Sequence, residues 1–308
     1  MEKIQLFAFA DEADKCVDGQ ILAMKRNGLC GLEIRGVDGV NVAKITPDKA
    51  REVRKKMDDN GLVTWSIGSP IGKINLEEDF VAHLDDLRNC LEVANILGAK
   101  NLRLFSFYMP KNEDPTPYKN AVIDRMGTFL EVAKGSGVVL CHENEKGIYG
   151  DIASRCLELH QALPELGGIF DPANYVQCGQ DTLAGWELLK DHIHYLHIKD
   201  ALADGSVVPA GKGIGNVPVI VKSFMARGGN ACTMEPHLKV FDGLKALEES
   251  GNTSVVGGIY RYPDANTAFD AACDAMKAIL KEVSLCRSVL SFTPFVIFAR
   301  PRRILRCR

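Results

Sequence analysis

Residues 138–150 read Val-Val-Leu-Cys-His-Glu-Asn-Glu-Lys-Gly-Ile-Tyr-Gly, an apolar run that ends abruptly in acidic side chains. The run has the composition of a β-strand, in which successive side chains point to opposite faces. Val139, Cys141 and Glu143 therefore share one face, and Glu143 is the first polar residue on it. The pattern suits a carboxylate held where a strand ends, but a solvated charge just beyond a strand gives the same sequence.

The chain on either side of this stretch repeats a strand–helix unit. Glycines expected to end helices lie at 28, 61, 98 and 137, which are 33, 37 and 39 residues apart, and an apolar segment follows each one. This is the length that a βαβ crossover between parallel strands requires. Doubly wound sheets usually have five or six strands, so eight alternating strands favour a single-domain α/β fold, the closed (β/α)8 TIM barrel. The expected strands are residues 4–10, 30–34, 62–67, 101–107, 138–143, 168–170, 193–198 and 232–234, and the expected helices are 17–26, 47–60, 77–97, 118–134, 151–163, 182–189, 217–227, 244–249 and 265–283.

Composition and charge limit the classes of function. The chain has 308 residues, of which 46% are hydrophobic and 25% charged, as in a soluble globular protein with a full core. A net charge of −3 gives no sign of a nucleic-acid surface. The first residues do not resemble a signal peptide, and no apolar run reaches transmembrane length. Ten scattered cysteines without a CxxC pair are typical of reduced cytosolic thiols. We therefore expect a cytoplasmic protein with no nucleic-acid or membrane partner, and leave a homo-oligomer open.

The last 25 residues differ from the rest of the chain. Residues 284–308 contain six arginines, no lysine and no acidic residue. We expect residues 1–283 to form the barrel and the arginine-rich tail to lie outside the fold. A frame error or read-through explains this change of composition better than a basic interfacial anchor does.

Three more strand ends carry side chains that bind metals. Asp171 follows the strand 168–170, His197 lies in the strand 193–198, and Glu235 follows the strand 232–234. Because the carboxyl ends of TIM-barrel strands surround the active site, Glu143 and these three side chains are expected to meet there. Three carboxylates and one imidazole suit a divalent ion such as Mn²⁺, Mg²⁺, Co²⁺ or Zn²⁺ and argue against a closed structural zinc site.

Four motifs surround these residues, namely His142-Glu143-Asn144, Phe170-Asp171, Leu196-His197-Ile198-Lys199-Asp200 and Met234-Glu235-Pro236-His237. In these motifs the chain, over residues 3–283, resembles the xylose isomerase-like TIM-barrel superfamily, which includes sugar phosphate isomerases and epimerases, ketose 3-epimerases, hydroxypyruvate isomerase and inosose dehydratase. The resemblance implies one divalent metal ion bound by Glu143, Asp171, His197 and Glu235, and a small carbohydrate as substrate. It also implies that Glu143 and Glu235 form the catalytic acid–base pair. Asn174 is a departure, because many epimerases have a substrate-binding histidine at that position, and this leaves the exact substrate open.

The chemistry expected of such a site is isomerase chemistry. A proton next to a carbonyl leaves more easily when a metal ion stabilises the enediolate that develops. One carboxylate removes the proton, and a second on the opposite face returns it. Return to the same carbon gives epimerisation, and return to the neighbouring carbon gives aldose–ketose isomerisation. Glu143 and Glu235, three strands apart, are placed to act in this way. An inosose-type dehydratase and a non-catalytic sugar-binding barrel are the alternatives, whereas an abasic-site endonuclease needs more histidine ligands.

Four further side chains are candidates for substrate binding, namely Asn174, Lys199, His237 and Glu145. Glu145 shares the face of Glu143 and is also a substitute ligand. For Lys199, a substrate contact and a salt bridge with Asp200 are equally open.

Other charged or glycine-rich positions have structural interpretations. Arg103 is expected to form an ion pair at the bottom of the barrel, and Glu33 and Arg35 are expected to pair with each other. His142 and His194 point away from the expected site. The sequence Gly-Lys-Gly-Ile-Gly at 211–215 fits a flexible turn better than a phosphate-binding loop, so the sequence leaves phosphorylated and free sugars open.

Overall fold

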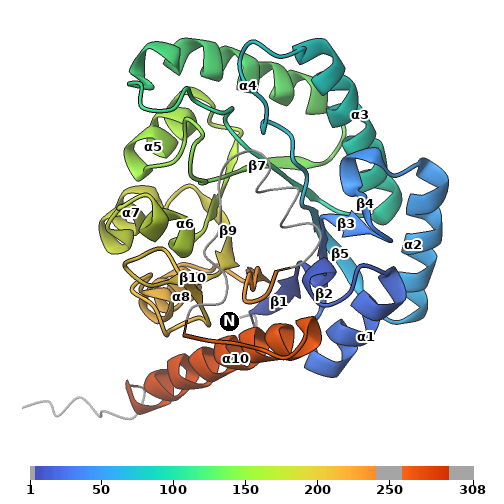
Figure 1. Cartoon of the computed structure of the whole chain (residues 1–308), viewed down its shortest axis with the longest axis vertical. Coiled ribbons are helices and arrows are strands. Elements are labelled where there is room, and N and C mark those ends of the chain that lie inside the picture. The colour runs from blue at the N-terminus through green and yellow to red at the C-terminus, as the bar shows by residue number, and fades with distance from the viewer. Residues whose placement is uncertain (1–3, 241–258, 291–308) are drawn as a thin grey trace, which may run out of the picture.

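The computed structural model describes residues 4–240 and 259–290 and confirms the TIM barrel (Figure 1). Its parallel strands close in the order β1-β12-β9-β8-β7-β6-β5-β2, with β2 hydrogen-bonded to β1. The ring is formed by β1 (Gln5–Ala8), β2 (Gly31–Ile34), β5 (Val63–Ile67), β6 (Asn101–Leu104), β7 (Val139–Glu143), β8 (Gly167–Phe170), β9 (Ile193–Ile198) and β12 (Ala231–Met234).

Helices surround the ring, as Figure 1 shows. They are α1 (Val17–Asn27), α2 (Pro47–Asp59), α3 (Phe80–Leu97), α4 (Lys119–Ala133), α5 (Ala153–Ala162), α6 (Pro172–Gln177), α7 (Thr182–Leu189), α8 (Val217–Ala226) and α10 (Ala265–Leu290). The loops contain the 3-10 helices η1 (Ala10–Glu12), η2 (Val42–Lys44) and η3 (Thr116–Tyr118) and the short strand pairs β3 (Gly36–Val37) with β4 (Val40–Asn41) and β10 (Asp200–Ala201) with β11 (Val207–Val208).

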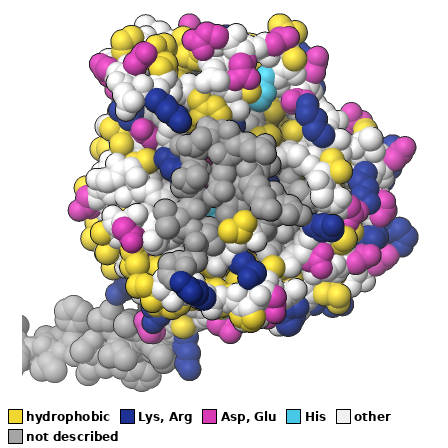
Figure 2. Space-filling model, in the orientation of Figure 1, with side chains coloured by type: hydrophobic (Ala, Val, Ile, Leu, Met, Phe, Trp, Pro, Cys, Tyr) yellow, Lys and Arg dark blue, Asp and Glu magenta, His cyan; other side chains and the backbone are white. Residues whose placement is uncertain are grey.

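Local sequence signals set several helix ends. The Thr46 side chain caps α2 by accepting from the Lys49 amide, and proline occupies the first turn. Gly28 and Gly98 end α1 and α3 in the left-handed conformation, with φ of 61° and 76°. Over the exposed side of α2, acidic and basic side chains are interspersed and form i,i+3 and i,i+4 pairs (Figure 2). Such pairs are typical of a solvated helix face.

Several predicted boundaries differ from the structure by one or more residues. Strand β1 ends at Ala8 because residues 10–12 turn into η1, and β6 ends at Leu104, ahead of a left-handed residue at Phe107. Helix α3 begins at Phe80 rather than 77, because the Asp79 carboxylate caps it. Helix α10 continues to Leu290, seven residues beyond the boundary expected at 283. The helix expected at 244–249 and the tail from residue 291 lie outside the described residues.

The inside of the barrel contains two kinds of side chain. Its apolar part, which we call the inner apolar cluster, consists of Phe7, Trp65, Cys141, Ile169, Tyr195 and Ala231. The Phe7 and Trp65 rings stack with centroids 4.9 Å apart. Cys141 therefore lies inside the barrel, on the face that it was predicted to share with Glu143.

No helix among the described residues is both long and apolar enough to cross a bilayer.

Candidate metal centre

The four predicted ligands converge inside the barrel. Glu143, Asp171, His197 and Glu235 come from four neighbouring strands, β7, β8, β9 and β12, or from the residue just after the strand. One donor atom from each lies within 4.8 Å of the others. No member of the group is more than 3% exposed. Strand order thus brings together residues that are up to 92 positions apart in the chain.

The two carboxylate oxygens of Asp171 have different surroundings. Its backbone amide donates to the Asn144 side chain over 2.9 Å, and its Oδ1 accepts from the Asn174 amide over 2.9 Å as the N-cap of α6. Its Oδ2 is buried and accepts no hydrogen bond, although the Lys199 ammonium lies 3.1 Å away. One oxygen therefore fixes the side chain, and the other remains available to a ligand ion.

Glu143 and Glu235 contact mostly different side chains, and Arg103 lies close to both. Glu143 Oε1 lies 2.8 Å from His197 Nδ1, and its Oε2 accepts from Arg103 over 3.1 Å. Glu235 accepts from Arg35 over 3.2 Å and from Lys199 over 2.9 Å. Arg103 also lies 3.8 Å from Glu235. Arg103 forms an ion pair as expected, but the predicted place is wrong, because Arg103 pairs with Glu143 beside Glu235 and not at the bottom of the barrel.

Electrostatic interactions separate the pKa values of these groups. Burial opposes the ionisation of Glu143, but His197 and Arg103 hold its pKa below the ordinary value. Burial raises the pKa of Asp171 to about 7, in spite of Lys199. Burial disfavours a charged His197, but the carboxylates of Glu143 and Glu33 raise its pKa to about 10. Without a bound ion, the imidazole is therefore protonated at neutral pH.

The centre contains more acidic than basic groups. Among the described residues in direct contact, six carboxyl groups face three permanent cations: Asp11, Glu12, Glu33, Glu143, Asp171 and Glu235 against Arg35, Arg103 and Lys199. Buried charge of one sign is costly unless it is compensated. Without an ion, protons on Glu12, Asp171 and His197 reduce this excess, since the pKa values of these groups are about 8, 7 and 10. A divalent cation is able to replace those protons, and the oxygen-rich donor set with one imidazole suits such an ion. The residues present therefore fit a metal ion.

The predicted substrate-binding residues lie around this centre. Asn174 donates to the Asn144 carbonyl over 2.9 Å and approaches Glu143 Oε1 at 3.5 Å, so it contacts one of the four predicted ligands. Lys199 pairs with Asp171 and Glu235, and the alternative salt bridge with Asp200 is wrong. Glu145 instead pairs with Lys73 at 3.1 Å and does not belong to the four-ligand group.

His237 lies beside the centre. Its backbone amide donates to Glu12 over 2.7 Å, and its ring is 3.5 Å from Glu235. Glu12 is buried, which raises its pKa to about 8 although Arg35 opposes this shift. The sequence interpretation did not identify Glu12, because a carboxylate after the first strand resembles a solvated loop residue.

Glu33 and Arg35 do not pair with each other as expected. Arg35 binds Asp11 over 2.9 Å and contacts Glu235, whereas Glu33 contacts His197 at 3.1 Å. Both side chains belong to the centre, and sequence reasoning missed them. The available signal was two charged residues at the end of a strand, the same signal that identified Glu143.

The glycine-rich loop at 211–215 has an internal partner. The Asp200 carboxylate accepts from the amides of Gly211, Gly213 and Gly215 over 2.9, 3.0 and 2.9 Å. A Cβ atom added at Gly213 would lie only 2.3 Å from Asp200 Oδ1. The loop therefore holds a carboxylate of its own chain where a phosphate was considered.

His142 is buried next to Ser106 at 3.0 Å, away from the four predicted ligands, as expected.

Comparison with known proteins supports the same fold. A family model described as "Xylose isomerase-like TIM barrel" matches residues 21–250. No curated protein sequence matches the chain.

Solved structures of the same fold share little sequence with this chain. An L-ribulose 3-epimerase has a TM-score of 0.72 at 16% identity, with 96% of this chain and 100% of that chain covered. A probable 3-DHS dehydratase of petrobactin synthesis from Bacillus anthracis has a TM-score of 0.68 at 16% identity, with 90% and 99% covered. The IOLI protein, whose structure contains a zinc atom, has a TM-score of 0.68 at 14% identity, with 91% and 99% covered. At these identities the likeness establishes the fold alone.

Proposed function

Because the chain belongs to the xylose isomerase-like TIM-barrel family, we propose that it is a divalent-metal-dependent isomerase or epimerase of a small carbohydrate. The observation that carries the proposal is the placement of Glu143 and Glu235. These two carboxylates lie three strands apart in the ring, and each has a donor atom in the group formed with Asp171 and His197. One site thus contains an oxygen-rich donor set and two candidate bases.

The side chains have separate parts in this proposal. Glu143, Asp171, His197 and Glu235 are the metal ligands. A bound divalent ion supplies positive charge next to the carbonyl and hydroxyl oxygens of the substrate. The cations around Glu143 and Glu235 lower the pKa of both, so the ionised form of either is able to accept a proton from a carbon next to the carbonyl. In each turnover the ionised glutamate takes the proton, and the other, which has taken up a proton from solvent beforehand, delivers that proton to the opposite face.

The surrounding residues support these roles. Arg103 lies between the two glutamates and is fixed by the carbonyls of Gly68 and Ser69 over 3.1 and 3.4 Å. Burial of the whole group excludes bulk water, which strengthens its electrostatic interactions. We also propose a cytoplasmic location, because the eight described cysteines are all free.

The proposal is tested by hydrogen exchange into a panel of ketoses and aldoses. The protein is incubated with each sugar, free and phosphorylated, in D₂O with Mn²⁺ present; after removal of the metal, the sugars are analysed by NMR and mass spectrometry. We expect deuterium on the carbon next to the carbonyl of one sugar and a product that is an isomer or epimer of it, with a mass that differs only by the exchanged hydrogen. Loss of water from the sugar would instead support a dehydratase, for which a structural neighbour is named. Binding without exchange would support a non-catalytic sugar-binding barrel.

A further inference from the structure

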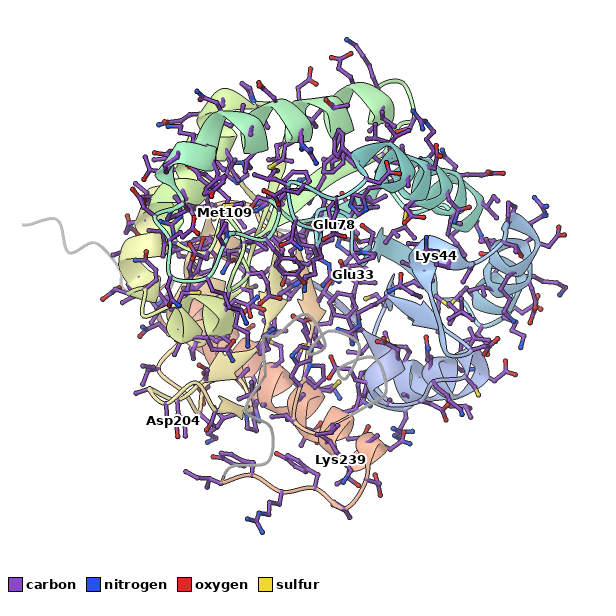
Figure 3. The ribbon with its side chains drawn as sticks, turned by 45° about the horizontal axis from the view of Figure 1, so that its top comes forward. Glu33, Lys44, Glu78, Met109, Asp204 and Lys239 are labelled. Atoms are coloured by element: carbon purple, nitrogen blue, oxygen red, sulfur yellow. The ribbon has the colours of Figure 1, made fainter. Side chains whose placement is uncertain are left out.

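Glu33 is a buried carboxylate that the proposed proton transfer does not use. It comes from β2, and its Oε2 lies 3.1 Å from Nε2 of His197 on β9, across the inside of the barrel. Its side chain is 1% exposed. In Figure 3 Glu33 lies near the middle of the molecule, whereas Asp204 and Lys239 lie toward its edge. The contact therefore joins a non-ligand strand to a ligand.

Glu33 is itself held in place from two other strands. Its Oε1 accepts from the Tyr195 hydroxyl over 2.9 Å and from the Ser66 hydroxyl over 3.2 Å. The two hydroxyl groups are 3.1 Å apart. Since Ser66 and Tyr195 are both buried, this arrangement fixes the carboxylate without help from bulk water.

The two nitrogens of His197 face different surroundings. Nδ1 lies 2.8 Å from Glu143 and 3.7 Å from Glu235, which places it toward the other metal ligands. Nε2 faces Glu33. A neutral imidazole carries its proton on one nitrogen only, and the nitrogen without the proton is the one able to bind a metal.

We propose that Glu33 is a positioning residue for the metal centre, which accepts the Nε2 proton of His197 and so directs the Nδ1 lone pair toward the ion. Tyr195 and Ser66 hold Glu33 in the orientation that this requires. The inference rests on the metal-binding part of the proposed function, and it adds a role for three residues outside the ligand set. Carboxylate partners of this kind commonly strengthen metal affinity by about 10–100-fold.

The test compares Glu33→Gln with wild type by zinc affinity and by nitrogen-15 NMR of the histidine rings in the zinc-loaded protein. A glutamine amide can either accept from Nε2–H or donate to Nε2, so it no longer selects one tautomer. We expect Glu33→Gln to weaken zinc binding by about 10–100-fold and the wild-type His197 to carry its proton on Nε2. Glu12→Gln is the matched control, because it removes a buried carboxyl group that does not contact His197. It is expected to leave the His197 tautomer unchanged.

Two further variants keep the test decisive if Glu33→Gln fails to fold. Tyr195→Phe and Ser66→Ala each remove one hydroxyl that holds Glu33, and each is expected to weaken zinc binding several-fold. Unchanged zinc affinity and tautomer in all folded variants would overturn the role of Glu33. His197→Ala distinguishes this from failure of the metal site: if that variant binds zinc like wild type, the metal centre itself is wrong.

Discussion

The inner apolar cluster and the candidate metal centre lie in the same barrel and follow opposite rules. Both are built from inward-facing residues of the same strands, so that Cys141 belongs to one and Glu143, two residues later, to the other. The cluster contains stacked and edge-to-face aromatic rings, as in Trp65 against Tyr195 at 5.7 Å. The centre contains ion pairs between groups that burial would otherwise neutralise. Burial therefore stabilises the fold in the apolar cluster, whereas in the candidate metal centre it shifts the pKa values of the charged side chains.

The two regions differ in whether they need a bound ligand. The apolar side chains complete one another by packing, and nothing further is required. The centre retains more carboxyl groups than cations among its described residues, and Asp171 Oδ2 lacks a hydrogen bond. This contrast predicts that changes in the centre act on ligand binding, whereas changes of the purely apolar side chains in the cluster act on stability. Tyr195 is the exception, because its ring belongs to the cluster and its hydroxyl binds Glu33.

The largest effect is expected from removing a ligand. Asp171→Asn keeps the oxygen that caps α6 but removes a negative charge, and His197→Ala removes the imidazole. Each variant should lose its bound divalent ion, measured by elemental analysis after gel filtration. Metal-free Asp171→Asn should melt close to metal-free wild type, because relief of the repulsion among carboxylates offsets the lost ion pair with Lys199, which keeps Glu235 as a partner. Full metal occupancy in both variants would exclude this site.

The second effect concerns pH. Burial raises the pKa of Asp171 to about 7, whereas Glu143 and Glu33 overcome burial to raise that of His197 to about 10, so both groups bind protons near neutral pH in the metal-free protein. Metal binding needs both deprotonated, hence apparent affinity should rise with pH from 6 to 8, by about tenfold per unit for each proton released. Calorimetry in buffers of different ionisation enthalpy measures this release. An affinity independent of pH would contradict the pKa shifts.

A smaller effect, on stability and not on metal binding, is expected in the inner apolar cluster. Ile169 is 2% exposed, and Ile169→Ala leaves a cavity whose cost is about 2–5 kcal/mol. The melting temperature should fall while the metal stoichiometry of the folded protein is unchanged. Loss of metal from folded Ile169→Ala would show that the two regions are not separate.

The smallest effect is expected at the C-terminus. We propose that the arginine-rich tail is dispensable, but the helix that precedes it ends at Leu290 rather than at 283. Truncation after residue 290 should leave melting temperature and metal content unchanged. Insoluble protein after this truncation would assign the tail to the fold.

Sequence reasoning predicted the barrel, which the structure confirms, and four candidate ligands, whose side chains the structure brings together, because both follow from local patterns. Repeated helix-ending glycines indicate the unit length, and polar residues at strand ends mark one edge of a parallel barrel. It failed where partners come from distant strands: nothing local in Glu33 or Arg35 shows that one contacts His197 and the other Glu235. Asp200 was missed as the partner of the glycine loop for the same reason, since three backbone amides leave no sequence signal.

The role of the two glutamates is tested most directly by deuterium exchange in Glu143→Gln and Glu235→Gln at saturating metal. Glutamine keeps the size of the side chain but removes the base, so net conversion should fall by about 10²–10⁴-fold in each variant. The remaining glutamate should still exchange the substrate proton of one epimer with D₂O, and the two variants should prefer opposite epimers. Near-normal conversion in both variants would contradict the account and direct attention to Lys199, His237 and Glu145.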